Sequence, residues 1–135
     1  MVTEFLEGSL ILIVEDDYLT ACILSEWVED FGGSVVGPAR GLAQATSLIE
    51  PAELAGAILD VNLGDEKCFA LVDKLLADRI PVIFVTGADR RSLPDRFAEI
   101  CVVGKPFDAL AVEKALRRAF GVRRLCPFSG LDRAL

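Results

Sequence analysis

With 135 residues, the chain is long enough for one domain with a sizeable core, since domains commonly hold about 100–200 residues. Its net charge of −7 argues against binding to nucleic acid, which needs clustered Lys and Arg, and the absence of histidine excludes Ser–His and Cys–His hydrolytic pairs. Although the mean hydropathy is +0.45, no apolar run reaches the ~18 residues of a membrane-spanning helix, and we expect a soluble cytoplasmic protein with no membrane partner.

Strand and helix patterns alternate five times along the chain. The predicted strands are short, continuous apolar runs at residues 10–14, 34–37, 57–60, 82–85 and 100–103. Such runs are typical of a parallel sheet with helices on both faces. The predicted helices follow in turn at residues 18–31, 41–50, 67–78, 94–98 and 108–120. With right-handed crossovers, these units predict a flavodoxin-like α/β fold, in which a doubly wound, five-stranded parallel sheet has the order 2-1-3-4-5.

The ends and faces of several predicted helices can be assigned. The first repeats apolar residues at helical spacing, at Leu19, Ile23, Trp27 and Phe31, and Gly32-Gly33 ends it. The third presents an inward stripe of Phe69, Val72, Leu75 and Leu76. The short fourth helix is expected to begin at Ser92 as N-cap, with Asp95 as the acid at the third helical position.

The cysteines do not predict a metal site. All four lie far apart in apolar surroundings, at Cys22, Cys68, Cys101 and Cys126. Zinc sites usually need paired cysteines or histidines, and the chain has no C-x-x-C pair. We therefore expect free thiols, with the first three buried and Cys126 exposed.

Charged residues stand at the ends of three predicted strands. Glu15 and Asp16 follow the first strand, Asp60 ends the third, and Lys105 follows the fifth. Ligands of parallel α/β sheets bind at the carboxyl ends of the strands, so we expect these residues to form one site. Clustered carboxylates repel one another unless a cation lies among them, and a nearby lysine suits an anionic ligand. This pattern is typical of phosphoryl transfer to an aspartate, although Asp60 and Lys105 could each be ordinary loop residues.

The same residues give the chain a likeness to a known family. From residue 10 to residue 120 it resembles the receiver domain of bacterial two-component response regulators, in its stand-alone form. The motifs that carry the resemblance are, in order, Glu15-Asp16, Asp60, Thr86 and Lys105-Pro106-Phe107. The resemblance implies a receiver domain over residues 1–121 and a tail over residues 122–135, which is either a loose end or a contact with a partner or a second copy.

The resemblance implies a metal-dependent phosphoryl acceptor. Asp60 would take the phosphoryl group from a sensor histidine kinase, a histidine phosphotransfer protein or a small phosphodonor. Mg²⁺ would be held by Glu15, Asp16, Asp60 and the backbone carbonyl of Asn62. Asp17, the third acid after the first strand, is assigned mainly to the N-cap of the following helix.

The remaining motif residues would contact the phosphoryl group. Lys105 would pair with Asp60 before phosphorylation and with a phosphoryl oxygen afterwards, and the resemblance implies a cis bond between Lys105 and Pro106. Thr86 would donate its hydroxyl. The backbone N–H groups of Gly87 and Ala88 would face the same oxygens.

Two departures from the family pattern bear on how a signal leaves the site. Val102 occupies a position where many receivers carry an aromatic that swings inward with the threonine, and valine has no large rotamer change to transmit. The stretch at residues 81–87 resembles single-domain receivers that read Phe-Ala-Thr-Gly, but Val85 replaces the alanine and Ala88 replaces a following aromatic. Our hypothesis is that reordering of residues 86–94 and the short fourth helix carries the signal.

The sequence leaves the output open. A receiver without an effector would either bind partners through phosphorylation or serve as an intermediate or sink in a relay, and it would be no enzyme beyond its own phosphorylation and dephosphorylation. We expect the docking surface on the fourth helix, fifth strand and fifth helix. One alternative is an interaction module that does not use phosphorylation. A phosphatase with an aspartyl intermediate would need an acid where Asn62 stands.

Overall fold

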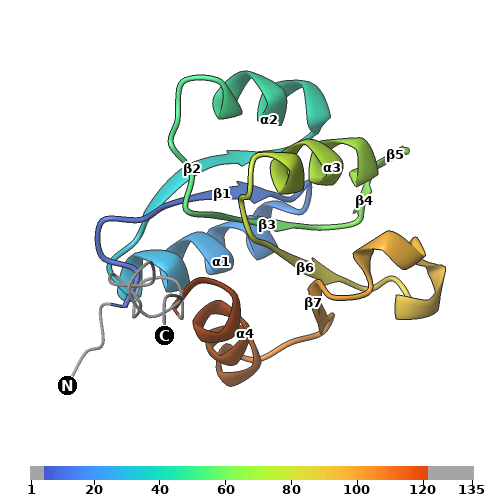
Figure 1. Ribbon diagram of the computed structural model, residues 1–135. Coiled ribbons are helices and arrows are strands. Elements are labelled where there is room, and N and C mark those ends of the chain that lie inside the picture. Colours follow the sequence, from blue (N-terminus) through green and yellow to red (C-terminus); the bar gives the residue numbers. More distant parts are fainter. Residues whose placement is uncertain (1–4, 122–135) are drawn as a thin grey trace, which may run out of the picture.

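Five parallel strands form the centre of the computed structural model, which describes residues 5–121 (Figure 1). These strands are β1 (Leu10–Val14), β2 (Ser34–Ala39), β3 (Gly56–Leu59), β6 (Val82–Thr86) and β7 (Cys101–Gly104). They pair in the order β2-β1-β3-β6-β7, and all neighbouring strands are parallel. The predicted order 2-1-3-4-5 and the doubly wound α/β fold are therefore confirmed.

Helices cover both faces of this sheet (Figure 1). One face carries α1 (Tyr18–Asp30) and α4 (Ala109–Leu116), and the other carries α2 (Leu42–Ile49) and α3 (Phe69–Ala77). A π-helical turn, η3 (Arg117–Gly121), continues α4. All four helices were expected from the sequence, although the last turn of the final one is π-helical. None of the helices within residues 5–121 is long and apolar enough to cross a membrane.

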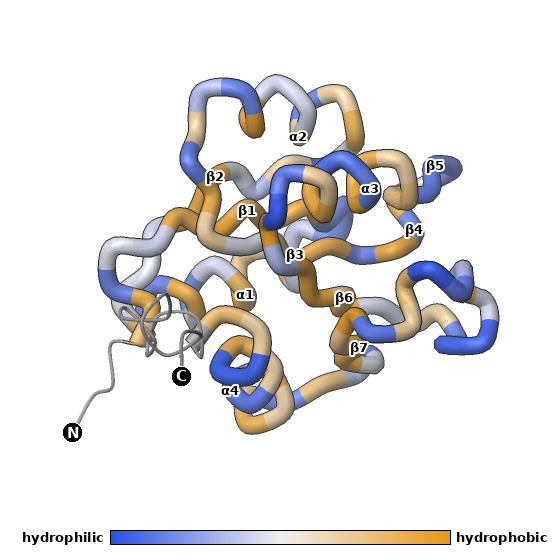
Figure 2. Tube along the Cα trace, in the orientation of Figure 1, coloured by the Kyte–Doolittle hydropathy of each residue, from blue (hydrophilic) through white to orange (hydrophobic). Residues whose placement is uncertain are grey.

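The sheet separates two apolar cores, because consecutive strand residues point to opposite faces. In β1, Leu12 and Val14 belong to the core beneath α2 and α3. Ile11 and Ile13 belong to the core beneath α1 and α4. Figure 2 shows the central strands drawn largely in the apolar colour. Burial on both faces explains why the strands read as continuous apolar runs in the sequence.

A close contact joins the end of the last helix to the beginning of β3. Gly56, the first residue of β3, lies against the buried ring of Phe120 in η3. A methyl group on Gly56 would come within 2.5 Å of the Phe120 ring atom Cε1, well inside van der Waals contact. This contact therefore requires a residue without a side chain at position 56.

The packed sides of α1 and α3 differ in part from the predicted stripes. The buried residues of α1 are Ala21, Leu24 and Val28, and those of α3 are Leu71, Val72 and Leu75. Leu76 was expected to face the core and is exposed, and Leu19 and Ile23 of the first stripe are exposed as well. Both helices carry apolar residues on more than one side, so spacing alone could not select the side that packs.

The cysteine predictions are correct only in part. Cys68 is buried and Cys101 is half-buried, and both are free thiols. Cys22 was expected to be buried, but it lies on the exposed side of α1. Burial raises the pKa of Cys68 to about 12, which keeps this thiol protonated and unreactive. Cys126 and the rest of the predicted tail lie outside the described residues.

The predicted helix at residues 94–98 is replaced by two single turns of 3₁₀ helix. These turns are η1 (Arg90–Ser92) and η2 (Asp95–Phe97). Ser92, the predicted N-cap, is instead the last residue of η1, which Asp89 caps with its side chain. The N-cap position of η2 is Pro94, which makes no side-chain cap. Leu93 and Pro94 between the turns are extended, because proline disfavours the helical conformation of the residue before it. Ser92 therefore cannot cap a helix that runs through Leu93 and Pro94, and the predicted range holds only the single turn η2 rather than an α-helix.

A small β-hairpin follows β3 where the sequence indicated a loop and a helix start. Its strands, β4 (Asn62–Leu63) and β5 (Glu66–Lys67), pair antiparallel. The two-residue turn places Gly64 at φ +66°, in the left-handed region that glycine adopts readily. Leu63 anchors the hairpin in the core beneath α2 and α3. The following helix α3 therefore begins at Phe69 rather than at residue 67.

Candidate functional site

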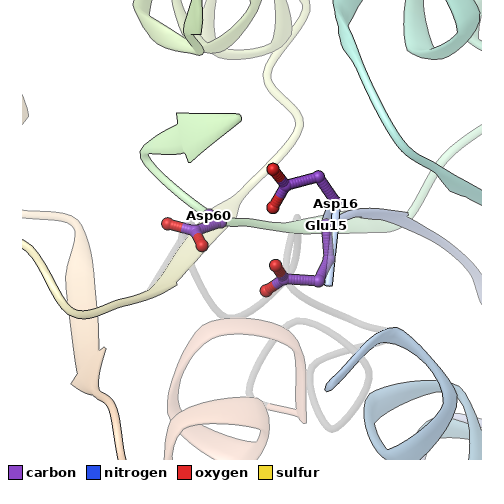
Figure 3. A group of neighbouring side chains, drawn as sticks. All are labelled: Glu15, Asp16 and Asp60. Atoms are coloured by element: carbon purple, nitrogen blue, oxygen red, sulfur yellow. The ribbon is translucent and has the colours of Figure 1, made fainter. Parts of the chain in front are cut away.

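Three carboxylates meet at the carboxyl ends of β1 and β3 (Figure 3). Glu15 and Asp16 follow β1, and Asp60 follows β3. Each offers an oxygen, and these oxygens all lie within 4.8 Å of one another. Glu15 and Asp60 are buried, whereas Asp16 is half-buried. The structure thus brings together the three acids that the sequence placed in one site.

Backbone hydrogen bonds hold these acids at the strand ends. The N–H of Glu15 donates to the carbonyl of Ala39 at 2.8 Å, and the N–H of Asp60 donates to the carbonyl of Val14 at 3.0 Å. Both bonds continue the parallel ladders past the last strand residue. The carboxyl groups of Glu15 and Asp60 are therefore positioned by the sheet rather than by a loop.

Lys105 joins two of the three acids. Its Nζ lies 2.8 Å from Oδ2 of Asp60 and 2.9 Å from Oε1 of Glu15. The contact with Asp60 is a hydrogen bond. The Lys105 backbone N–H donates to the carbonyl of Thr86 at 3.0 Å, and the Lys105–Pro106 bond is cis, as expected. One ammonium group thus balances part of the negative charge of the site.

The Glu15 carboxylate is the most buried charge in this group, with 1% of the residue exposed. Its Oε2 accepts a hydrogen bond from the N–H of Asp17 at 3.0 Å. Its Oε1 has Lys105 as a charge partner at 2.9 Å, but the direction of approach does not make a hydrogen bond, so this oxygen lacks a donor. Burial raises the pKa of Glu15, and the charge of Asp60 adds to this effect, while Lys105 and the Asp17 N–H oppose it.

The ammonium group of Lys105 remains charged in this environment. Burial alone would lower its pKa, because a charged group is less stable away from water. The hydrogen bond to Asp60 and the negative charges of Asp60 and Glu15 outweigh burial, and the pKa of Lys105 is raised. A site with three carboxylates and one lysine therefore remains short of positive charge.

The donor set fits a hard divalent cation such as Mg²⁺. Carboxylate oxygens are the ligands that Mg²⁺ prefers, and Glu15 supplies a buried oxygen with no hydrogen-bond donor. The chain has no histidine, and none of the cysteines within residues 5–121 belongs to the cluster, so the set does not suit zinc. Glu15, Asp16 and Asp60 would hold the cation.

We compared the chain with known proteins. No family model matches the chain. The chain is 34% identical over 113 residues to the phyllosphere-induced regulator PhyR of Methylorubrum extorquens. That match covers 81% of this chain and 42% of PhyR, so the chain spans less than half the length of this curated relative.

Three of the solved structures that resemble the chain do so over most of their own length. SdrG from Sphingomonas melonis Fr1 is 39% identical, with 80% of this chain and 92% of SdrG covered and a TM-score of 0.71. The REC domain of the PhyR response regulator from Erythrobacter litoralis is 26% identical, with 83% and 89% covered and a TM-score of 0.75. This chain belongs to the receiver-domain family of response regulators. SdrG in its BeF3-activated conformation, attributed to Pseudomonas melonis Fr1, is also similar, at 38% identity over 86% and 96% with a TM-score of 0.68.

In this receiver domain, a local hydrogen bond joins the backbone just after β6 to the last residue of that strand. Thr86 is fully buried, and its Oγ1 accepts a hydrogen bond from the N–H of Ala88 at 3.2 Å. The Ala88 N–H is therefore occupied by Thr86 in this structure. A side chain on Gly87 would meet nothing within 4 Å, so the resting fold does not require glycine there.

Asp17 caps α1 as expected. Its Oδ2 accepts hydrogen bonds from the backbone N–H of Thr20 at 2.9 Å and from the Thr20 hydroxyl at 2.6 Å. These two bonds lower the pKa of Asp17, because they favour the ionised carboxylate. Asp17 thus serves the helix, while its backbone N–H serves Glu15.

Sequence reasoning missed the contacts of the β4–β5 hairpin beside the receiver's acidic site. The backbone N–H of Asn62 donates to Oδ1 of Asp60 at 3.1 Å. The ammonium group of Lys67 donates to the side-chain oxygen of Asn62. Oε1 of Glu66 accepts from the N–H of Leu42, the first residue of α2, at 3.3 Å. The Gly-Asp pair at residues 64–65 was the available signal, since such pairs form two-residue hairpin turns.

Two surface grooves flank the site of this receiver. The first, of about 820 Å³, lies between α1 and β2 and is lined by Glu15, Tyr18, Cys22, Ile23, Pro38 and Arg40, among others. Beside it, Tyr18 and Leu19 are largely exposed. The second, of about 420 Å³, lies between β7 and α4 and is lined by Val102, Phe107, Ala111, Lys114 and Arg118, among others. Apolar exposure of this kind marks surfaces suited to protein contacts.

Removing the charge of Glu15 should stabilise the metal-free protein at neutral pH. Because the pKa of Glu15 is raised on folding, the folded state binds more protons than the unfolded chain between the two pKa values. Stability therefore falls as pH rises through that window. We expect Glu15→Gln to raise the midpoint of thermal unfolding by a few degrees near pH 7.5, with a smaller gain near pH 4, where Glu15 is largely protonated in both the folded and the unfolded state of the natural protein.

Circular dichroism melting curves at both pH values measure this difference. The exposed Glu53→Gln is the matched control and should change the midpoint little at either pH. An equal gain from Glu15→Gln at both pH values would show that its effect does not come from the buried charge.

Proposed function

We propose that this receiver domain is a phosphorylation switch that accepts a phosphoryl group on Asp60 with the help of Mg²⁺. The observation that carries the proposal is the bridge from Lys105 to Asp60 and Glu15, within a carboxylate cluster at the sheet edge. This arrangement supports the proposal because Asp60 could serve as the nucleophile, Lys105 as the cation for the incoming anion, and the carboxylates as metal ligands, all in one site. When bound, Mg²⁺ would offset the negative charge that gathers as the phosphoryl group arrives.

The proposed reaction is a transfer from nitrogen to oxygen. A carboxylate oxygen of Asp60 attacks the phosphorus atom of a phosphohistidine, the P–N bond breaks, and the imidazole nitrogen keeps the electron pair and takes a proton. Lys105 would then shift from the carboxylates toward a phosphoryl oxygen. Thr86 would donate its hydroxyl to another oxygen, and the N–H groups of Gly87 and Ala88 would face the same group after Ala88 leaves Thr86.

The groove beside α1 fits a donor protein. Exposed Tyr18 and Leu19 and the half-exposed Ile23 present apolar surface next to Glu15, within reach of the acceptor site. We propose that a sensor histidine kinase or a histidine phosphotransfer protein docks there. The similarity to SdrG, which has been solved in a BeF3-activated form, supports a phosphorylation response in this chain.

The output surface would be the groove between β7 and α4. Val102 and Phe107 supply apolar contacts there, and Lys114 and Arg118 supply positive charge. Reordering of residues 86–94 would carry the signal toward this groove, since Thr86 pairs with Gly104, which lines it, and the segment contains only the single turn η1. The result is a cytoplasmic signalling protein that binds a partner or passes its phosphoryl group on, with no enzymatic activity beyond its own phosphorylation. A contact through the tail or with a second copy stays a prediction outside the described residues.

Intact-protein mass spectrometry tests the proposal. Incubation with a small phosphodonor such as acetyl phosphate and Mg²⁺ should add one phosphoryl group to the protein. Asp60→Asn and addition of a metal chelator should each abolish the adduct, because the first removes the nucleophile and the second removes the cation. Asp65→Asn, in the exposed turn of the hairpin, is the matched control and should keep the adduct.

The result separates the two functions that the sequence left open. An adduct that needs both Asp60 and the metal supports the switch. If no adduct forms, and Mg²⁺ with beryllofluoride produces no change in the amide spectrum, the chain is an interaction module that does not use phosphorylation.

A further inference from the structure

Asn62 makes hydrogen bonds through both its backbone and its side chain next to Asp60, the proposed phosphoacceptor. Its backbone N–H donates to Oδ1 of Asp60 at 3.1 Å. Its side-chain oxygen accepts a hydrogen bond from Lys67, which lies opposite it in the β4–β5 hairpin. Lys67 thus fixes the side-chain amide of Asn62, while the Asn62 backbone N–H remains bonded to Asp60, which would carry the phosphoryl group.

The hairpin itself is fixed on two sides. Leu63 is buried in the core beneath α2 and α3. Glu66 accepts from the first N–H of α2 at 3.3 Å. Lys67 therefore approaches Asn62 from a defined position and does not depend on a free loop.

Lys67 contacts an amide although acids lie next to it in the chain. Asp65 and Glu66 precede it directly, and an ammonium group would ordinarily pair with a carboxylate. Within residues 5–121, no carboxylate oxygen lies within 4.0 Å of its Nζ, and the ammonium instead donates to Asn62. The geometry of the hairpin, rather than charge attraction, selects this contact.

The orientation of that amide matters for hydrolysis of an aspartyl phosphate. In this step, a water oxygen attacks phosphorus, the bond from phosphorus to the Asp60 oxygen breaks, and the carboxylate leaves with the electron pair. The water proton passes to solvent, and inorganic phosphate departs. A side-chain amide close to the phosphoryl group can orient the attacking water and so speed this step. Asn62 is the amide residue nearest in sequence to Asp60, two positions away.

We propose that Lys67 is a positioning residue that lengthens the lifetime of the phosphorylated state by keeping the Asn62 side-chain oxygen bonded within the β4–β5 hairpin, so that the amide does not orient the attacking water. The proposal rests on the proposed function of Asp60 as the acceptor. It predicts that loss of the ammonium group frees the Asn62 side chain to turn toward the phosphoryl group.

The hydrogen bond between Lys67 and the Asn62 side chain can be tested without phosphorylating the protein. The chain has one asparagine and one glutamine, so side-chain NH₂ signals in a ¹⁵N-correlated NMR spectrum come only from Asn62 and Gln44. In the metal-free protein, Lys67→Met should shift the Asn62 pair and leave Gln44 in place, since Gln44 bonds to Arg40 at the start of α2. Lys67→Arg, which keeps a donor, should return the Asn62 pair toward its original position.

The lifetime is then measured as loss of the phosphoryl adduct over time after removal of the phosphodonor. Lys67→Met should hydrolyse several-fold faster than the natural protein, and Lys67→Arg should hydrolyse at nearly the natural rate. In an Asn62→Ala background, Lys67→Met should have no further effect, because Lys67 acts through the Asn62 amide. Lys74→Met on α3, an exposed lysine 3.8 Å from Glu50, is the matched control for loss of one positive charge.

Failure of the proposed function and failure of the role of Lys67 give different results in these experiments. If the natural protein forms no adduct, the proposed function fails. If the adduct forms but Lys67→Met hydrolyses at the natural rate, or if its effect persists without the Asn62 side chain, the role of Lys67 is overturned. An unshifted Asn62 amide signal in Lys67→Met would overturn it as well.

Discussion

Lys105→Met should lower the free energy of unfolding of the metal-free protein by about 2–4 kcal/mol. The substitution keeps most of the side-chain volume and removes the ammonium that lies within 3 Å of Glu15 and Asp60. Two buried carboxylates would then face each other without a charge partner, and breaking such buried pairs is strongly destabilising. We expect the lower part of the usual range, since the Lys105 side chain is 25% exposed and water can enter.

The same substitution should strengthen the binding of Mg²⁺. In the resting protein, Lys105 competes with a cation for the oxygens of Glu15 and Asp60, so its removal leaves a more negative site. Urea unfolding with and without Mg²⁺ measures both effects, because a bound cation restores part of the lost stability. Lys74→Met serves as control, since its exposed pair with Glu50 contributes little. Equal losses for Lys74→Met and Lys105→Met would contradict the prediction.

Phe120→Ala should be the most destabilising substitution at the end of the described chain, at a cost of about 3–5 kcal/mol. The Phe120 ring is buried in the core beneath α1 and α4 and fills the space above Gly56. Gly56→Ala should cost about 1–3 kcal/mol, because its methyl group would overlap the ring. In the Phe120→Ala background, the same Gly56→Ala change should be nearly neutral, since the cavity accepts the methyl group.

Urea unfolding of the single and double variants measures this coupling. Gly104→Ala, also at a strand glycine but with open space around it, is the matched control for Gly56 and should have little effect. Leu110→Ala on the exposed side of α4 is the control for Phe120 and should stay within about 0.5 kcal/mol. A full cost of Gly56→Ala in the absence of the Phe120 ring would show that the contact is not the cause.

The sheet and the position of the acids could be predicted because they depend on simple rules. Continuous apolar runs indicate strands buried on both faces, and parallel strands bring their carboxyl ends to one edge. Asp60 stands directly after such a run, so its place in the site followed from the end of β3. The pairing of Lys105 with Asp60 was also expected. That Glu15 shares the same ammonium was not, because side-chain directions change where a strand ends.

The elements that the sequence did not predict are short and depend on the surrounding structure. The strands of the β4–β5 hairpin have two residues each, too few for an alternating pattern to appear. The turns η1 and η2 are separated by Leu93 and Pro94, and a spacing rule for N-caps does not account for proline. The choice of Ala21 rather than Leu19 for the packed side of α1 is made by contact with the sheet. Local propensity alone does not contain this information.

The sheet that divides the two cores also affects how such a protein can diverge. Both grooves beside the site border α1 or α4, and these two helices share the core that contains Ile11 and Ile13. The helices α2 and α3 pack on the opposite face and have their own core. Substitutions in side chains that do not touch are nearly additive in their effect on stability. Mutations that adapt one face to new binding partners can therefore accumulate over generations while the packing of the other face stays unchanged.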